Sequence, residues 1–100
     1  SAIQVYLQAL EIFNTEKVQL QEKQHQYADA LILWELGNRY FDQGQYEQAL
    51  KVYQKSLIAY KGSTNNEADV LRDMGNTYYE MKQNSQALEL YGRSLTAYQT

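Results

Sequence analysis

The sequence contains no cysteine and no proline, and His25 is its single histidine. Without cysteine the chain can form neither a disulfide framework nor a thiolate-based metal or redox site. One histidine also excludes any site built from several imidazoles. His25 lies between two glutamines, so we interpret it as a solvated side chain. The sequence therefore predicts no metal site and no cofactor.

Long apolar runs and an excess of basic charge are also missing. The longest apolar run covers residues 30–34, far too short to span a bilayer. The N-terminus shows no basic segment followed by an apolar one, and there is no Asn-x-Ser/Thr acceptor site. The formal net charge is −3, whereas nucleic-acid-binding domains normally present a basic face. We therefore expect a cytoplasmic protein with no nucleic-acid and no membrane partner.

Catalytic constellations are absent as well. No nucleophile is accompanied by a base and an orienting partner, and no glycine-rich phosphate loop or metal-ligand spacing occurs. The acidic side chains follow helical surfaces, where charges usually face solvent. The sequence predicts that the protein is not an enzyme and that it has no catalytic residues.

What the sequence does contain is an internal repeat. Residues 30–62 align without a gap with residues 68–100 at an offset of 38, and 14 of the 33 pairs are identical. Unrelated chains of ordinary composition would share only about two. Repeats of this length cannot bury their apolar faces alone, so they must stack on one another.

Apolar residues recur at helical spacing through both copies. Gly44 is a stop signal, and the polar segment 62–66 is the clearest loop signal in the chain. Asn84 or Ser85 can cap the last helix. The pattern predicts helices over residues 27–43, 46–60 and 67–82, and another from residue 84 or 85 onward.

The N-terminal segment, residues 1–25, matches half a repeat. Residues 6–10 read Tyr-Leu-Gln-Ala-Leu, and residues 46–50 read Tyr-Glu-Gln-Ala-Leu. We therefore predict that residues 2–20 form a second helix without its first, followed at 21–26 by a turn or a helix extension. The predicted fold is one all-α domain of five helices and about two and a half repeats, divided at 1–25, 26–63 and 64–100.

Two glycines lie in mid-helix, where glycine costs up to about 1 kcal/mol relative to alanine. They are Gly37 and Gly75, and each has a small residue twelve positions later, Ala49 or Ala87. We predict that each glycine faces its alanine, flanked by tyrosines. Two small residues in contact let helix axes approach toward the short end of the roughly 8–10 Å range.

These spacings resemble the tetratricopeptide repeat. The first copy carries the pattern at Leu33, Leu36, Gly37, Tyr40, Gly44, Tyr46, Ala49, Tyr53 and Leu57, and the second at Leu71, Met74, Gly75, Tyr78, Ala87, Tyr91 and Leu95. Lys82 and Asn84 depart from its Gly-x-Tyr turn, and Ser56 and Ser94 from a common alanine. The repeat length of 38 to 40 resembles the longer-repeat branch of kinesin light chains and Pins-type polarity adaptors. The resemblance implies a right-handed α-solenoid.

The resemblance also implies a peptide-binding role, because in this family the first helix of each repeat lines a concave groove. The matched asparagines offer amides that can donate to and accept from a peptide backbone. The aromatic residues are candidate anchors, and the arginine is a candidate partner for a ligand carboxylate. The residues predicted to bind peptide are Asn38, Asn76, Trp34, Phe41, Arg72 and Tyr79.

Each of these residues also has a structural alternative. An asparagine can satisfy a neighbouring helix, and aromatic residues at helical spacing are more often core, with Trp34 packed against the N-terminal helix. Arg72 can pair with Asp69 or Asp73. Since Arg72 is the one well-placed basic residue, the groove resembles the carboxylate-clamp type poorly. Nearby acidic residues favour a neutral or basic peptide.

A second hypothesis is architectural: a spacer or self-assembly segment of a larger scaffold or signalling protein. Helical arrays usually need polar capping elements. The last predicted helix instead carries Leu90, Tyr91, Leu95 and Tyr98. We therefore add the hypothesis that uncapped ends associate into a homo-oligomer.

Overall fold

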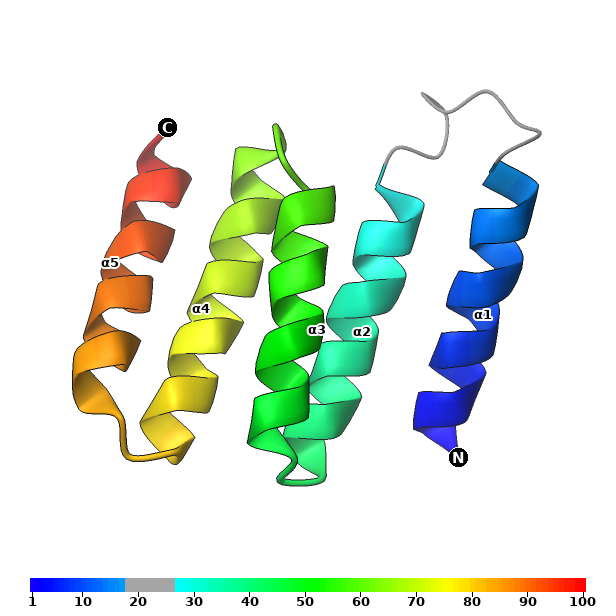
Figure 1. Ribbon diagram of the computed structural model, residues 1–100. Helices are drawn as coiled ribbons and strands as arrows, with labels where there is room; N and C mark the ends of the chain where they lie inside the picture. Colours follow the sequence, from blue (N-terminus) through cyan, green and yellow to red (C-terminus); the bar gives the residue numbers. More distant parts are fainter. Residues whose placement is uncertain (18–26) are drawn as a thin grey trace.

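The structure is a computed structural model that describes residues 1–17 and 27–100. The described part consists of α-helices without any strand, arranged as a flat array with principal extents of 43 × 35 × 13 Å (Figure 1). Consecutive helices pack against each other, most extensively α2 on α3 and α4 on α5. The predicted all-α helical-repeat fold is therefore confirmed. The helices are α1 (Ala2–Lys17), α2 (Ala28–Asp42), α3 (Tyr46–Ala59), α4 (Thr64–Glu80) and α5 (Asn84–Gln99).

The observed helix ends lie close to the predicted ones, with one clear difference at α4. This helix begins at Thr64, so most of the polar segment 62–66 forms its first turn rather than a loop. Side chains there satisfy free donors: the Gly62 amide donates to Glu67 Oε2 at 2.9 Å. Helix starts accept polar residues because the first amides lack partners within the helix. The predicted end of the first helix at residue 20 lies outside the described residues, as does the turn or extension predicted at 21–26 with His25.

Gly44 and Lys82 occupy the same turn position in successive repeats. Gly44 has φ 74° and Lys82 has φ 64°, both in the left-handed region. Their amides donate to equivalent carbonyls, Phe41 at 2.9 Å and Tyr79 at 3.0 Å. An L-residue in this conformation costs roughly 1–2 kcal/mol. The replacement of glycine by Lys82 therefore makes the second turn less stable but leaves its backbone conformation unchanged.

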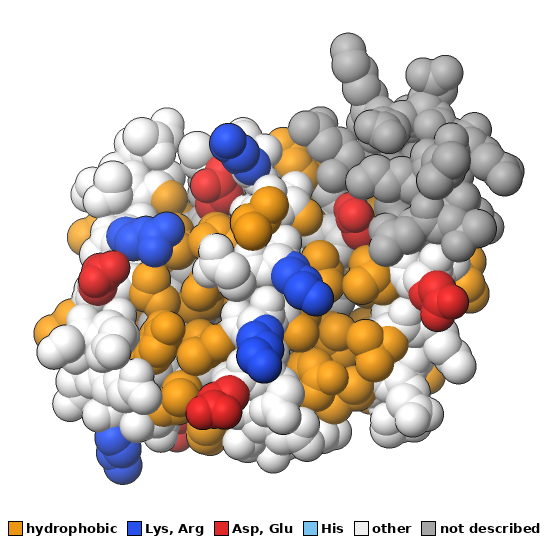
Figure 2. Space-filling model, viewed as in Figure 1, with side chains coloured by type: hydrophobic (Ala, Val, Ile, Leu, Met, Phe, Trp, Pro, Cys, Tyr) orange, Lys and Arg blue, Asp and Glu red, His pale blue; other side chains and the backbone are white. Residues whose placement is uncertain are grey.

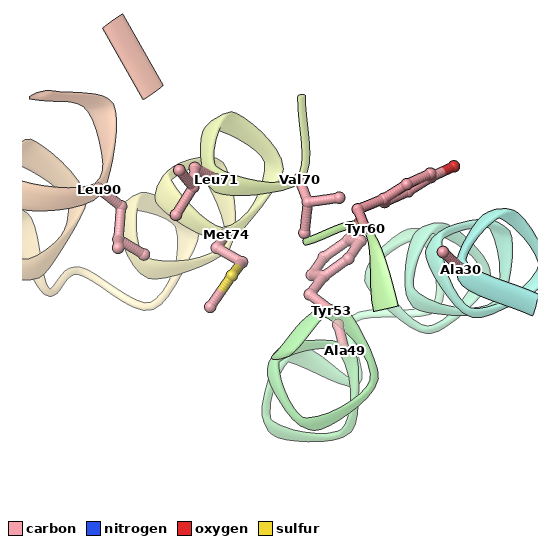
Figure 3. Close-up of a cluster of buried hydrophobic side chains, with 8 residues drawn as sticks. All are labelled: Ala30, Ala49, Tyr53, Tyr60, Val70, Leu71, Met74 and Leu90. Atoms are coloured by element: carbon pink, nitrogen blue, oxygen red, sulfur yellow. The ribbon is translucent and has the colours of Figure 1, made fainter. Parts of the chain in front are cut away.

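One hydrophobic cluster runs through both repeats (Figure 3). Tyr53 of α3 and Val70 of α4 are each 1% exposed and lie in the same cluster, which joins the two hairpins. Because the cluster is continuous, neither repeat has a separate core, as expected for stacked units. Its buried members are Ala30, Ala49, Tyr53, Tyr60, Val70, Leu71, Met74 and Leu90.

The mid-helix glycines make room for tyrosine rings. A Cβ atom placed on Gly37 would lie 2.6 Å from two ring carbons of Tyr53, and one on Gly75 would lie 2.7 Å from two ring carbons of Tyr91. The prediction that glycine allows close packing at these positions is confirmed, and the tyrosine rings make the closest approach. The nearest atoms belong to the tyrosines and not to the buried alanine at position 49 or 87, because the flat ring fits onto exposed helix backbone.

The serines that replace the usual alanine have a structural reason. Ser56 Oγ donates to the Ala30 carbonyl at 2.8 Å, and Ser94 Oγ donates to the Ala68 carbonyl at 2.7 Å. Both hydroxyls are buried, and a buried hydroxyl needs such a partner. Each serine therefore ties the second helix of a repeat to the start of the first, at a net gain of about 1 kcal/mol.

Alanine substitutions at three glycines test the ring contact. We expect Gly37→Ala and Gly75→Ala to lower the free energy of unfolding by about 1–3 kcal/mol, because the new methyl group overlaps a tyrosine ring. Gly92→Ala is the matched control, since nothing lies within 4 Å of a Cβ atom there. It should raise stability by about 0.5–1 kcal/mol through helix propensity alone. Urea denaturation of the three variants measures the difference, and equal effects at all three glycines would contradict the assigned contact.

Candidate functional site

The six predicted binding residues lie on α2 and α4 at matching positions. Trp34, Asn38 and Phe41 follow one side of α2, and their counterparts in the next repeat follow the same side of α4. Spacings of four and three positions place side chains on one helix face. We call this surface the asparagine face, made of Trp34, Asn38, Phe41, Arg72, Asn76 and Tyr79.

Each asparagine is held by a tyrosine of the following helix. The Tyr53 hydroxyl donates to Asn38 Oδ1 at 2.6 Å, and the Tyr91 hydroxyl donates to Asn76 Oδ1 at 2.6 Å. Burial raises the pKa of both tyrosines above the ordinary value, so both hydroxyls remain protonated donors at neutral pH. The amide oxygens therefore satisfy a neighbouring helix, which is the structural alternative to peptide binding.

The amide nitrogens are far less engaged. Asn38 Nδ2 makes one long contact with Glu35 Oε1, at 3.5 Å. Within the described part of the chain, Asn76 Nδ2 donates to no protein group. The tyrosine bond uses the amide oxygen of each asparagine and leaves the amide nitrogen for other partners. The asparagines thus retain donors, while their acceptors are used inside the fold.

Trp34 connects the two repeats. Its indole Nε1 donates to Asp73 Oδ2 of α4 at 2.6 Å, and its half-buried ring packs against the hydrophobic cluster. The polar end of the ring therefore faces the following repeat. Partial packing of Trp34 against the N-terminal helix stays a prediction. Glu35, the counterpart of Asp73, accepts a hydrogen bond from the Tyr6 hydroxyl of α1 at 3.3 Å. This carboxylate position thus links each first helix to the repeat before it.

The other two aromatic residues differ in exposure. Phe41 packs against Tyr46 across the α2–α3 turn, with ring centroids 5.4 Å apart and an interplanar angle of 62°. Tyr79 is 59% exposed and belongs to no such pair among the described residues. Phe41 is therefore a packing residue in this structure, and Tyr79 is the aromatic side chain that is open to a ligand.

Arg72 is already paired. Its guanidinium lies 3.7 Å from Asp69 Oδ1 and 3.5 Å from Asp73 Oδ1, and it donates to the Tyr98 hydroxyl at 3.3 Å. Tyr98 in turn donates to Asp69. Two carboxylates face one guanidinium, so this part of the asparagine face is not a site for a ligand carboxylate. It suits a neutral or cationic group instead.

Asp73 lies beside the asparagine face, where it accepts the Trp34 hydrogen bond and pairs with Arg72. Burial raises the pKa of its carboxyl, and the Trp34 and Arg72 hydrogen bonds lower it without cancelling the effect of burial.

Among the described residues, no three histidine, aspartate or glutamate side chains are grouped so as to hold a metal ion. None of the described helices has the length and apolarity needed to cross a membrane.

Sequence reasoning missed the second-helix contribution to this site. The repeat pattern includes Tyr53 and Tyr91, but it does not predict their hydrogen bonds to the asparagines. A signal existed, because each asparagine is followed by its tyrosine at the same interval in both copies. The sequence gives no such signal for the hydrogen bond between Trp34 and Asp73. The equivalent residue Glu35 has a different partner, the Tyr6 hydroxyl.

The raised pKa of Asp73 makes stability depend on pH. Between the unfolded value of about 4 and the raised folded value, the folded protein holds more protons than the unfolded one, so stability falls as pH rises. Asp73→Asn keeps an acceptor for Trp34 and removes this titration. We expect its stability relative to wild type to increase from about pH 4 upward and then to level off. Urea denaturation across this range measures it, with Glu80→Gln on the same helix as control, and a constant difference for Asp73→Asn would contradict the assignment.

Comparison with known proteins agrees with these features. A sequence profile described as a tetratricopeptide repeat matches residues 28–100, which covers both helix pairs from α2 to α5. Searches of curated proteins and of solved structures each found no match. Repeats of this family generally mediate protein–protein interaction and are not catalytic. The helix pairs stack, and in each pair a glycine lies under a tyrosine ring. Since the family profile also matches residues 28–100, the chain belongs to the tetratricopeptide repeat family.

Proposed function

We propose that the protein binds a peptide segment of a partner protein along the asparagine face. The observation that carries this proposal is the tyrosine–asparagine hydrogen bond, present at 2.6 Å in both repeats. It leaves two amide N–H donors at equivalent positions, oriented by the fold before any ligand arrives. A pair of such donors can bond the carbonyl groups of an extended backbone whatever its side chains.

The charges of this face favour a neutral or basic peptide. Asp69 and Asp73 flank Arg72, and exposed Glu80 lies farther along the same helix. Tyr79 offers an exposed ring that can stack on an apolar or cationic side chain. The long interval between the two copies supports placing the chain in the longer-repeat branch of the family, with kinesin light chains and Pins-type adaptors. Its cytoplasmic location and its membership of a larger scaffold stay predictions from the sequence.

Alanine substitution of the two asparagines tests the site. We expect Asn38→Ala and Asn76→Ala each to weaken a peptide selected from an array of neutral and basic sequences by about three- to tenfold, because each removes one hydrogen-bond donor. Isothermal titration calorimetry measures the affinity. Gln54→Ala is the control, since this exposed amide lies on α3, which contributes no residue to the asparagine face.

A second variant separates the amide from its orientation. Tyr53→Phe keeps the ring on Gly37 and removes the hydroxyl that holds Asn38. The amide is still present but free to rotate, so affinity should fall less than in Asn38→Ala. Full affinity in both asparagine variants would exclude this face as the binding site.

Self-association is a second candidate function, and a difference between equivalent helices favours it. Tyr60, the C-cap residue of α3, is 4% exposed and lies in the same buried cluster as Val70 of α4, whereas its counterpart Tyr98 of α5 is 43% exposed. Leu88 and Leu95 of α5 are 71% and 59% exposed, while their counterparts on α3 are half-buried. The exposed face of α5 therefore carries the same apolar residues that are partly buried on α3, the equivalent helix of the preceding repeat.

Charge substitution on α5 tests this candidate. We expect the wild-type protein to form dimers at high micromolar concentration, and the Leu88→Glu, Leu95→Glu double variant to remain monomeric because it places carboxylates in the apolar contact. Ile58→Glu is the matched control, since Ile58 is 66% exposed on α3. Sedimentation equilibrium measures the mass, and a strictly monomeric wild type would exclude self-association.

A further inference from the structure

A second recessed surface lies between α1 and α3, with α2 as its floor. It encloses about 260 Å³ and is lined mainly by apolar side chains, including Leu7 and Leu10 of α1, Leu33 of α2 and Val52 of α3. Lys51 and Lys55 of α3 lie along its edge. Figure 2 shows this apolar hollow between α3 and α1 with basic side chains beside it. We call it the lysine groove, made of these six residues.

The lysine groove has an equivalent one repeat later in the chain. A smaller hollow of about 180 Å³ lies between α3 and α5 over α4. Most of its lining positions are the repeat equivalents of positions that line the larger hollow, so the same packing geometry forms both. The equivalent pairs are Leu36 and Met74, Tyr40 and Tyr78, Gln48 and Gln86, Lys51 and Glu89, Val52 and Leu90, and Lys55 and Arg93.

Charge distinguishes the two hollows. The later one carries one acid and one base, Glu89 and Arg93, whereas the lysine groove carries two bases one helical turn apart. Lys51 and Lys55 form no ion pair with any described residue, and Glu47, one turn earlier, is not within salt-bridge distance. Like charges four positions apart destabilise a helix. No ion pair within the described chain offsets this cost, and an acidic partner would offset it.

We propose that the lysine groove docks an amphipathic, acidic helix of a partner protein. Its apolar side chains enter the space between Leu7, Leu10 and Val52, and two carboxylates one turn apart pair with Lys51 and Lys55. An amphipathic helix presents apolar and charged residues at this spacing, which matches the four-position step between the lysines. The asparagine face favours neutral or basic peptides, so the two surfaces select ligands of different charge.

Two synthetic peptides of about four helical turns test the proposal. The first carries leucines on one face and glutamates beside them, and the second replaces every glutamate with lysine. Calorimetry should detect binding of the glutamate peptide to the wild-type protein, weakened by added salt because the paired charges are partly exposed. We expect the Lys51→Glu, Lys55→Glu double variant to bind it about tenfold more weakly and to bind the lysine peptide more tightly than wild type does.

Controls separate this surface from the asparagine face. Lys61→Glu makes the same charge change at an exposed lysine outside the groove and should alter affinity by less than about twofold. Asn38→Ala and Asn76→Ala should leave glutamate-peptide binding unchanged, so this proposal can fail or succeed independently of the first. Methyl NMR should show shifts at Leu7, Leu10 and Val52. The proposal is overturned if the glutamate peptide does not bind, or if it binds the Lys51→Glu, Lys55→Glu variant as tightly as wild type. Shifts centred on the asparagine face would overturn it as well.

Discussion

The ring of Tyr53 rests on the backbone of Gly37, and its hydroxyl holds the neighbouring Asn38. One side chain thereby sets the distance between two helices and the orientation of an amide on the outer face. Tyr91 repeats the arrangement on Gly75 in the next helix pair. A methyl group at either glycine would displace the ring and with it the hydroxyl. Packing and the proposed recognition therefore depend on the same contact, which is present in both copies.

The stacking of helix pairs creates two kinds of surface on one small domain. First helices supply the asparagine face, where Asp69 and Asp73 surround Arg72. Second helices supply the edges of the lysine groove, where Lys51 and Lys55 have no counter-charge within the described residues. Neither surface needs a loop or an insertion, because both arise wherever a helix pair packs on its neighbour. A domain of this kind can present one partner with donors and acids and another with apolar groups and bases.

The two copies share several packing contacts and differ at several exposed positions. The serine hydroxyls at 56 and 94 make the same bond to the first helix, at 2.8 and 2.7 Å. The residue at the turn changes from Gly44 to Lys82, yet φ remains positive in both. Side chains in the shared core must fit fixed neighbours, whereas outward side chains meet only water or a partner. Divergence between copies therefore marks the surfaces where binding specificity can differ.

The sequence by itself determined the helices, their order and the faces that carry the six candidate residues, because helical periodicity and the internal repeat are local properties of the chain. It also indicated that Gly37 marks a close approach. Only the tertiary structure decided which atoms meet. It placed Tyr53 on Gly37, bonded Trp34 to Asp73, and paired Arg72 within the fold. Such pairings depend on the separation of helices and on side-chain rotamers, and one sequence read along a single helix contains neither.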